Sequence, residues 1–345
     1  MKQILHFITL VLVLLSISCS NQKSGKLADG REDWPKKLNY AYSPSQENPE
    51  GRLKYSNALV DYIGEYIGIP ARLYETGSYG PTIMAMRSGM VDIAQSSPMG
   101  YMIASEKTDV EPLVTRGYQD ENDQYRLGSY HSLIVVPADS PYNSIEDLKN
   151  DAANITFTFV DVASTSGHLV PRNALEKLGV NPEADFKQVV FTQNQLNSIM
   201  TLSAGKVEAG AIMERVIKYM ALRGKLDPSE IKTIWKSEPV MSTGVYVRNE
   251  LPRSLKEEIR NAYLDMKKLR PDIIEMRLAL YPGLIDPDLS YIPAYDHMWD
   301  ELREIAKNIE SMNLIEGKPG RNGWNEEKRQ AYITKQQALL ASLQN

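Results

Sequence analysis

Three consecutive hydroxyl side chains stand out in the segment Asp161-Val-Ala-Ser164-Thr165-Ser166-Gly-His-Leu-Val-Pro171. The segment follows an apolar run and opens a predicted helix. The first turn of a helix offers unpaired N–H groups and about half a positive charge. Hydroxyls at that place can hold a tetrahedral oxyanion and release it again, because they carry no fixed counter-charge. Two interpretations stay open here: a site for a small oxyanion, or plain N-capping by Ser164 or Ser166.

Motifs of catalysis are few in this chain. It has no Gly-rich phosphate loop, no His-Glu-x-x-His and no Gly-x-Ser-x-Gly. Residues 203–206 match Ser-x-x-Lys without its companion motifs, and Gly205 followed by Lys is typical of a helix end. His131, His168 and His297 lack the spacing of metal ligands, and one cysteine cannot form a thiol-rich zinc site. We therefore predict a binding protein with no catalytic residue, no metal and no cofactor.

The elements that must position the hydroxyls alternate between strand and helix. Apolar runs bounded by turn residues predict strands over 38–42, 71–74, 91–94, 132–136, 155–160, 189–191 and 207–212. Helical spacing predicts helices over 53–67, from Pro81 to Gly89, over 164–178 and over 196–203. Such an order indicates two successive α/β modules with mostly parallel sheets. Residues 255–345 are predicted to be mostly helical. The helices beyond Met298 have no assigned role, and support of the first module is one option.

Composition limits the class of protein. Its 345 residues suggest two domains at ~150 residues per domain. A net charge of −5 argues against nucleic acid as the main partner, because phosphate binding needs basic surface. The chain has 19 tyrosines against 5 phenylalanines, which suits either a wet, selective cleft or half-exposed strands.

The N-terminus predicts export. Lys2 precedes an almost wholly apolar run over 4–15, which is too short to span a bilayer and typical of a signal peptide over 1–18. The residues before Cys19 resemble the lipobox of bacterial lipoproteins, so Cys19 is predicted to be acylated and 19–35 to form a tether. The alternative is an ordinary signal peptide with an incidental cysteine.

The hydroxyl segment resembles the signature of phosphonate- and phosphite-type substrate-binding proteins of ABC importers, the PhnD-like branch of type II periplasmic binding proteins. Other segments resemble this family in the same order, and together they span about 38–270: residues 76–79, 83–94, 130–141, 145–148, 190–191, 205–211, 235–237 and 251–256.

The resemblance implies an α/β fold with two lobes, each a mostly parallel sheet flanked by helices, joined by two crossover hinge segments. Lobe 1 would comprise 36–136 and 240–345, and lobe 2 would comprise 137–239. The ligand would lie between the lobes, which close around it. The implied partner is the membrane part of an ABC permease, and we expect a monomer.

Site residues follow from the family by position. Tyr79 of lobe 1 and Tyr130 at the hinge would donate hydroxyls to the ligand, and Ser164, Thr165 and Ser166 would clasp it from lobe 2. The alternative interpretation of Tyr79 is a turn residue, and that of Tyr130 is an aromatic residue at a strand end.

This sequence departs from the family at several of these positions. Gln195 would replace a histidine found in many relatives, and Thr243 stands near the place of an aspartate that pairs with a protonated oxygen or an amine. That loss weakens the case for phosphite and 2-aminoethylphosphonate. Glu214 could meet an amine or be an exposed helix residue. We expect His168 at the rim of the cleft, where it would add positive charge at acid pH.

These inferences predict an exported lipoprotein that binds a phosphonate, phosphite or phosphate ester and delivers it to an ABC permease. One alternative is a ligand-sensing lipoprotein of the same fold without transport. Others are a binder of a sulfonate, carboxylate or pyrimidine, and an exported enzyme.

Overall fold

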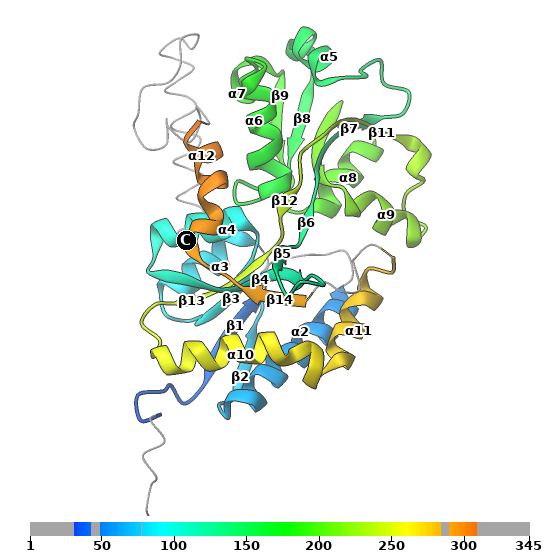
Figure 1. Ribbon diagram of the computed structural model, residues 1–345. Helices are drawn as coiled ribbons and strands as arrows, with labels where there is room; N and C mark the ends of the chain where they lie inside the picture. Colours follow the sequence, from blue (N-terminus) through cyan, green and yellow to red (C-terminus); the bar gives the residue numbers. More distant parts are fainter. Residues whose placement is uncertain (1–30, 43–48, 77, 284–289, 309–345) are drawn as a thin grey trace, which may run out of the picture. The chain divides into compact units, whose positions relative to one another are not determined.

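The computed structural model describes residues 31–42, 49–76, 78–283 and 290–308 (Figure 1). The predicted signal peptide, Cys19 and the helices beyond residue 308 lie outside the described residues. The chain divides into a unit that ends at Trp34 and a body that begins at Pro35. The fold that follows is that of the body.

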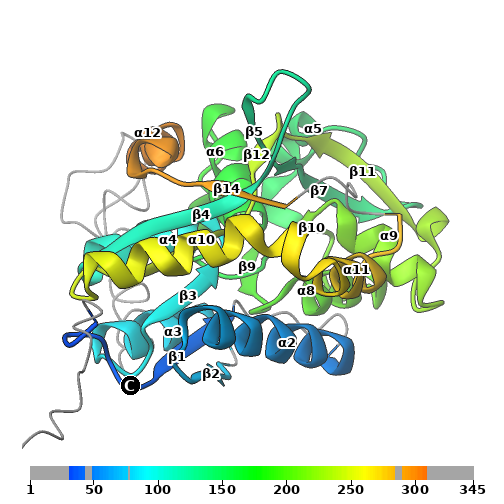
Figure 2. The same cartoon turned by 60° about the horizontal axis from the view of Figure 1, so that its bottom comes forward.

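Lobe 1 is built on a seven-stranded sheet with the order β14-β4-β13-β3-β1-β2, in which β5 also pairs with β4. Its strands are β1 (Leu38–Tyr42), β2 (Ala71–Tyr74), β3 (Ile93–Ser96), β4 (Val110–Gln119), β5 (Tyr125–Leu127), β13 (Gly244–Arg248) and β14 (Ser290–Pro293). Helices α2 (Pro49–Ile67), α10 (Arg253–Leu269) and α11 (Pro271–Leu280) pack together on one face of the sheet (Figure 2). Helices α3 (Tyr79–Arg87) and α4 (Pro98–Lys107) cover the other face (Figure 1).

Lobe 2 is built on a five-stranded sheet with the order β11-β7-β10-β8-β9. Its strands are β7 (Ser132–Pro137), β8 (Thr156–Phe159), β9 (Gln188–Phe191), β10 (Ala209–Met213) and β11 (Ile231–Lys236). Its helices are α5 (Ile145–Asn150), η1 (Ala152–Asn154), η2 (Thr165–Leu169), α6 (Val170–Lys177), α7 (Pro182–Asp185), α8 (Gln195–Ser203), α9 (Arg215–Leu222) and η3 (Pro228–Glu230). Two separate apolar clusters, one with Leu175 of α6 and one with Ile199 of α8, form the core of this lobe.

Two short strands connect the lobes, as the two-lobed prediction requires. β6 (Ser129–Tyr130) and β12 (Val240–Met241) pair antiparallel, with Tyr130 opposite Val240. β6 leads into β7 of lobe 2, and β12 leads into β13 of lobe 1 (Figure 1). The lobe limits at 136/137 and 239/240 stay a prediction, and β7 pairs within the five-stranded sheet although most of it precedes residue 137.

The predicted α/β architecture is confirmed, but the prediction of mostly parallel sheets is wrong. In lobe 1 only the pairs β1–β2 and β1–β3 are parallel, and β13, β4, β14 and β5 pair antiparallel. In lobe 2 β8 is parallel to β9 and β10, whereas β7 is antiparallel to β10 and β11. β7 and β13 enter their sheets directly from the other lobe rather than from a helix of their own lobe, so the βαβ rule does not set their direction.

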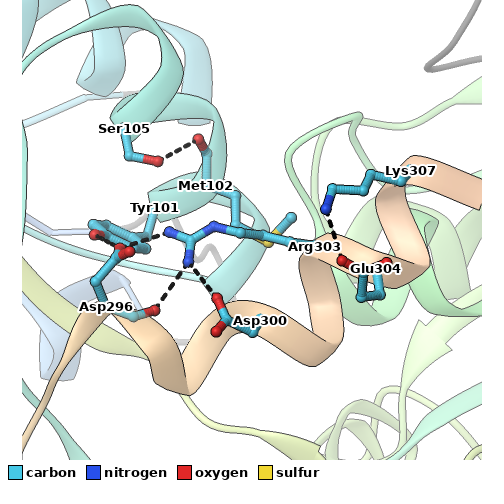
Figure 3. Close-up of polar contacts among 8 residues, drawn as sticks. All are labelled: Tyr101, Met102, Ser105, Asp296, Asp300, Arg303, Glu304 and Lys307. Carbon is cyan, nitrogen blue, oxygen red and sulfur yellow. Dashed lines mark hydrogen bonds and ion pairs between the residues drawn. The ribbon is translucent and has the colours of Figure 1, made fainter.

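The C-terminal part of the described chain also differs from the predicted run of helices, because it includes the edge strand β14. After it come η4 (Asp296–Trp299) and α12 (Asp300–Asn308). Helix α12 packs against α4 of lobe 1 and against α6 of lobe 2. Asp296 anchors it to α4 by accepting a hydrogen bond from Tyr101 at 2.5 Å and pairing with Arg303 at 2.6 Å (Figure 3). This helix therefore supports both lobes and not lobe 1 alone.

Candidate functional site

The three hydroxyl residues Ser164–Ser166, called the hydroxyl segment from here on, follow β8 after four intervening residues, 160–163. Each is at most 2% exposed. The Ser164 Oγ accepts the Gly167 N–H at 3.0 Å, and the carbonyl of Ser164 accepts the Leu169 N–H five residues on. The predicted helix over 164–178 thus begins with a wide π-helical turn, a feature often found at functional sites. A Cβ at Gly167 would overlap the side chain of Val160, so this turn needs glycine.

A second helix start, from lobe 1, meets the hydroxyl segment. Ser97 caps α4 by accepting the Gly100 N–H at 3.0 Å, and its hydroxyl donates to the Ala163 carbonyl of lobe 2 at 2.7 Å. The Met99 N–H donates to the Thr165 Oγ1 at 2.9 Å. Two helix N-termini, each with partial positive charge, therefore converge between the lobes. Our sequence analysis missed Ser97, although serine followed by proline is a recognised helix-start signal.

The structure brings Tyr130 and Gln195 to the hydroxyl segment, and their roles toward a ligand stay a prediction. Gln195 Nε2 donates to the Ser166 Oγ at 3.4 Å, and its Oε1 accepts the Met213 N–H at 2.8 Å. The Tyr130 side chain is 7% exposed. Burial raises the pKa of Tyr130, whereas hydrogen bonding to Ser166 and Thr165 and the nearby charge of Arg215 oppose that rise.

Thr243 lies on the lobe 1 side and connects to a buried polar network. The Thr243 Oγ1 accepts a hydrogen bond from Gln95 Nε2 at 3.4 Å. Gln95 Oε1 in turn accepts from the hydroxyls of Tyr40 and Tyr291, each at 3.2 Å. Tyr79 is half-buried at the first position of α3, and its approach to the hydroxyl segment stays a prediction.

The prediction that His168 lies at the rim is wrong. It is 4% exposed and packs between Phe159 and Phe191, with ring centroids 5.1 and 5.5 Å away. Burial, reinforced by the charge of Arg172, lowers the pKa of His168 to about 3. His168 is thus a neutral core residue at physiological pH and brings no charge to a ligand.

Glu214 is already paired within the protein. Its carboxylate lies 3.1 Å from the Lys236 Nζ and accepts the His131 N–H at 3.1 Å. The interpretation of Glu214 as a partner for a ligand amine therefore loses support, because both of its oxygens have protein donors.

The described residues contain neither a metal-binding cluster nor a helix that could cross a membrane. Within 31–42, 49–76, 78–283 and 290–308, no three His, Cys, Asp or Glu side chains group as a metal would require. None of the helices in the same ranges has the length and apolar character to cross a bilayer.

Comparison with known proteins gives the family. The family model described as "ABC transporter, phosphonate, periplasmic substrate-binding protein" matches residues 40–277, well over half of the chain. The phosphonates-binding periplasmic protein of Escherichia coli is 24% identical over 90% of this chain and 87% of its own length. The phosphate-import protein PhnD of Mycolicibacterium smegmatis is 26% identical over 69% of this chain and 73% of its own length.

A solved structure has the same fold. PhnD1 from Prochlorococcus marinus, in complex with methylphosphonate, superimposes with a TM-score of 0.65 at 19% identity and covers 79% of this chain and 98% of its own. The two-lobed fold, the ordered motifs around the hydroxyl segment and the matching family model agree. The chain belongs to the phosphonate family of periplasmic substrate-binding proteins of ABC transporters.

Proposed function

We propose that this protein holds a small phosphorus oxyanion, of phosphonate or phosphate-ester type, between its lobes and delivers it to an ABC permease. One observation carries the proposal: the hydroxyl segment of lobe 2 meets the N-terminus of α4 from lobe 1. Relatives named for phosphonates and for phosphate support the same ligand class.

The contacts between the lobes suggest how capture works. The Met99 N–H and the Thr165 hydroxyl bond to each other, and Ser97 bonds to Ala163. When the lobes part, the Met99 N–H and the hydroxyls of Ser97 and Thr165 lose these partners and become available as donors to ligand oxygens. Closure around a ligand then replaces two protein–protein hydrogen bonds with charge-assisted bonds to the oxyanion, which are roughly twice as strong as neutral ones.

Hydroxyl and N–H donors also suit release to a permease. They bind an anion without a fixed opposite charge, so that release of the ligand does not require the separation of an ion pair. Tyr130 and Gln195 complete this donor set from the hinge and from α8. We propose no chemical change of the ligand, in keeping with relatives that are transport proteins.

Export and anchoring belong to the same proposal. A signal peptide over 1–18 and acylation of Cys19 would tether a monomeric binding protein on the outer side of the membrane, close to its permease. Each buried methylene of an acyl chain contributes ~0.8 kcal/mol, so several chains anchor firmly. The ligand-sensing alternative predicts the same binding but no effect on uptake.

Thermal unfolding of the purified protein tests the ligand class. We would measure it with phosphate, methylphosphonate, phosphite, 2-aminoethylphosphonate, phosphate esters, sulfate and taurine. At a hundredfold excess over Kd a ligand stabilises the folded state by about 2.7 kcal/mol. A shift with a phosphorus oxyanion that Ser166→Ala reduces supports the proposal. A shift with taurine or sulfate alone would replace it by a sulfonate or sulfate binder.

A further inference from the structure

Two arginines lie buried in lobe 1, one on the sheet strand β4 and one on helix α11. Arg116 of β4 is 4% exposed and Arg277 of α11 is 3% exposed, and we call them the arginine pair. Among the described residues, the NH1 atom of each is buried without a hydrogen-bond partner. The Arg116 NH2 donates to the Tyr55 hydroxyl at 3.0 Å, and its guanidinium lies 4.0 Å from the ring centre of Tyr291.

Among the described residues, the partners of the arginine pair are hydroxyls, and none of them is a carboxylate. Arg116 and the hydroxyls of Tyr42, Tyr55 and Tyr291 influence the pKa of Arg277. Burial, together with the charge of Arg116, lowers the pKa of Arg277 to about 10, so Arg277 still carries its proton at neutral pH. Burial alone would raise the pKa of Tyr55, but the two arginines outweigh it and hold that pKa below its usual value.

Two like charges without a carboxylate are unusual in a protein interior. Across the described ranges, no ion pair joins Arg116 or Arg277 to an acidic side chain. Buried charges are normally paired, and a guanidinium cannot escape the cost by losing its proton. The pair, with its unused NH1 donors, therefore has the donor chemistry of an anion-binding site.

The arginine pair connects to the proposed oxyanion site from two sides. The backbone N–H of Arg116 donates to the Thr243 carbonyl at 3.2 Å. Tyr291, which lies under the Arg116 guanidinium, donates to Gln95, and Gln95 in turn donates to the Thr243 hydroxyl. On the other side, the charge of Arg116 adds to the effect of burial in lowering the pKa of Arg215. Arg215 lies 5.5 Å from the ring centre of Tyr130, which borders the hydroxyl segment.

We infer that the arginine pair, with the Tyr55 hydroxyl, binds a second acidic group of the ligand while the hydroxyl segment holds its phosphorus oxyanion. This inference rests on the proposed function and narrows its substrate class. The substrate is then a phosphonate or phosphate ester with a second oxyanionic group, a carboxylate or another phosphate. The planar guanidinium fork is suited to both groups, since it donates two parallel hydrogen bonds to a pair of oxygens.

Binding calorimetry with a graded ligand series tests this inference. We would compare methylphosphonate with phosphonoacetate, 3-phosphonopropionate, 4-phosphonobutyrate and methylenediphosphonate. The expected result is that at least one of the doubly acidic ligands binds 100-fold or more tightly than methylphosphonate. The comparison of the carboxylates with the diphosphonate shows whether the second acidic group is a carboxylate or a phosphate. The chain length of the tightest ligand gives the spacing of the two subsites.

Variants separate the two parts of the site. Arg277→Gln is expected to bring the affinity of the best doubly acidic ligand to within about fivefold of methylphosphonate, whose own affinity stays unchanged. Arg270→Gln is the matched control, because it removes an arginine charge at the N-terminal end of the same helix, α11, where Arg270 pairs with Asp272. Ser166→Ala is expected to weaken every ligand of the series.

Each outcome decides a different claim. If methylphosphonate binds but no second acidic group improves binding, or if Arg277→Gln weakens all ligands equally, the arginine pair is structural and the inference fails while the proposed function stands. If no phosphorus oxyanion binds the folded wild-type protein, the proposed function fails and the inference fails with it. Should Arg277→Gln not fold, the ligand series on the wild-type protein still decides.

Discussion

Replacement of Thr165 by valine removes one hydroxyl from the hydroxyl segment and keeps the shape of the side chain. Thr165 is fully buried, and its Oγ1 accepts the Met99 N–H at 2.9 Å. A hydrogen bond to a charged group contributes about 1.5–3 kcal/mol, and 1.4 kcal/mol corresponds to a tenfold change in Kd. If Thr165 donates to the bound oxyanion, Thr165→Val raises Kd by about 10- to 150-fold.

The same substitution has a separate effect on the unliganded protein. It leaves the buried Met99 N–H without an acceptor, which costs about 1–3 kcal/mol of unfolding free energy. Calorimetry gives Kd, and denaturant unfolding gives stability. The control is Ser144→Ala, which removes the cap of α5 at the end of lobe 2 far from lobe 1 (Figure 1). Loss of that cap costs about 1 kcal/mol and should leave Kd unchanged.

Two results would refute this reasoning. An unchanged Kd for folded Thr165→Val would mean that Thr165 does not bind the ligand and that the hydroxyl segment only caps a helix and contacts lobe 1. An equal loss of affinity in Ser144→Ala would show that affinity follows general stability and not donors at the site.

Three further predictions concern other parts of the chain. Cys19→Ser should move the protein from the membrane fraction to the soluble fraction of cells, and an unchanged distribution would contradict the lipid anchor. The pKa of His168 is lowered from its unfolded value near 6.5 to about 3, so the unfolded state binds more protons between these limits and stability falls as pH falls through that window. Unfolding of His168→Gln between pH 7 and 4 should show a smaller loss, and an identical slope would place His168 in a polar site. Gly167→Ala should cost about 1–3 kcal/mol by overlap with Val160, whereas wild-type stability in denaturant unfolding would mean that the π-helical turn adapts.

Local patterns predicted many of the elements and several of the site residues. β1 and β2 lie where the sequence predicts them, because apolar alternation acts within a few positions. β3 lies two residues after its predicted place, at Ile93–Ser96, since pairing with β1 and β13 selects the paired residues. The hydroxyl segment stood out by its residue types, whereas the role of Tyr130 depended on a family motif.

Long-range packing decided what the local patterns left open. The sequence alone determined that a helix begins at Ser164 shortly after a strand, because capping hydroxyls and Gly167 act over one turn. Only the tertiary structure decided that His168 is buried beside Arg172, that α4 meets Thr165, and that Arg116 and Arg277 share one interior. These contacts join residues from separate elements, and in the last two cases the partners stand 66 and 161 positions apart (277 − 116). The burial and charge that govern such contacts arise only when the lobes and layers assemble.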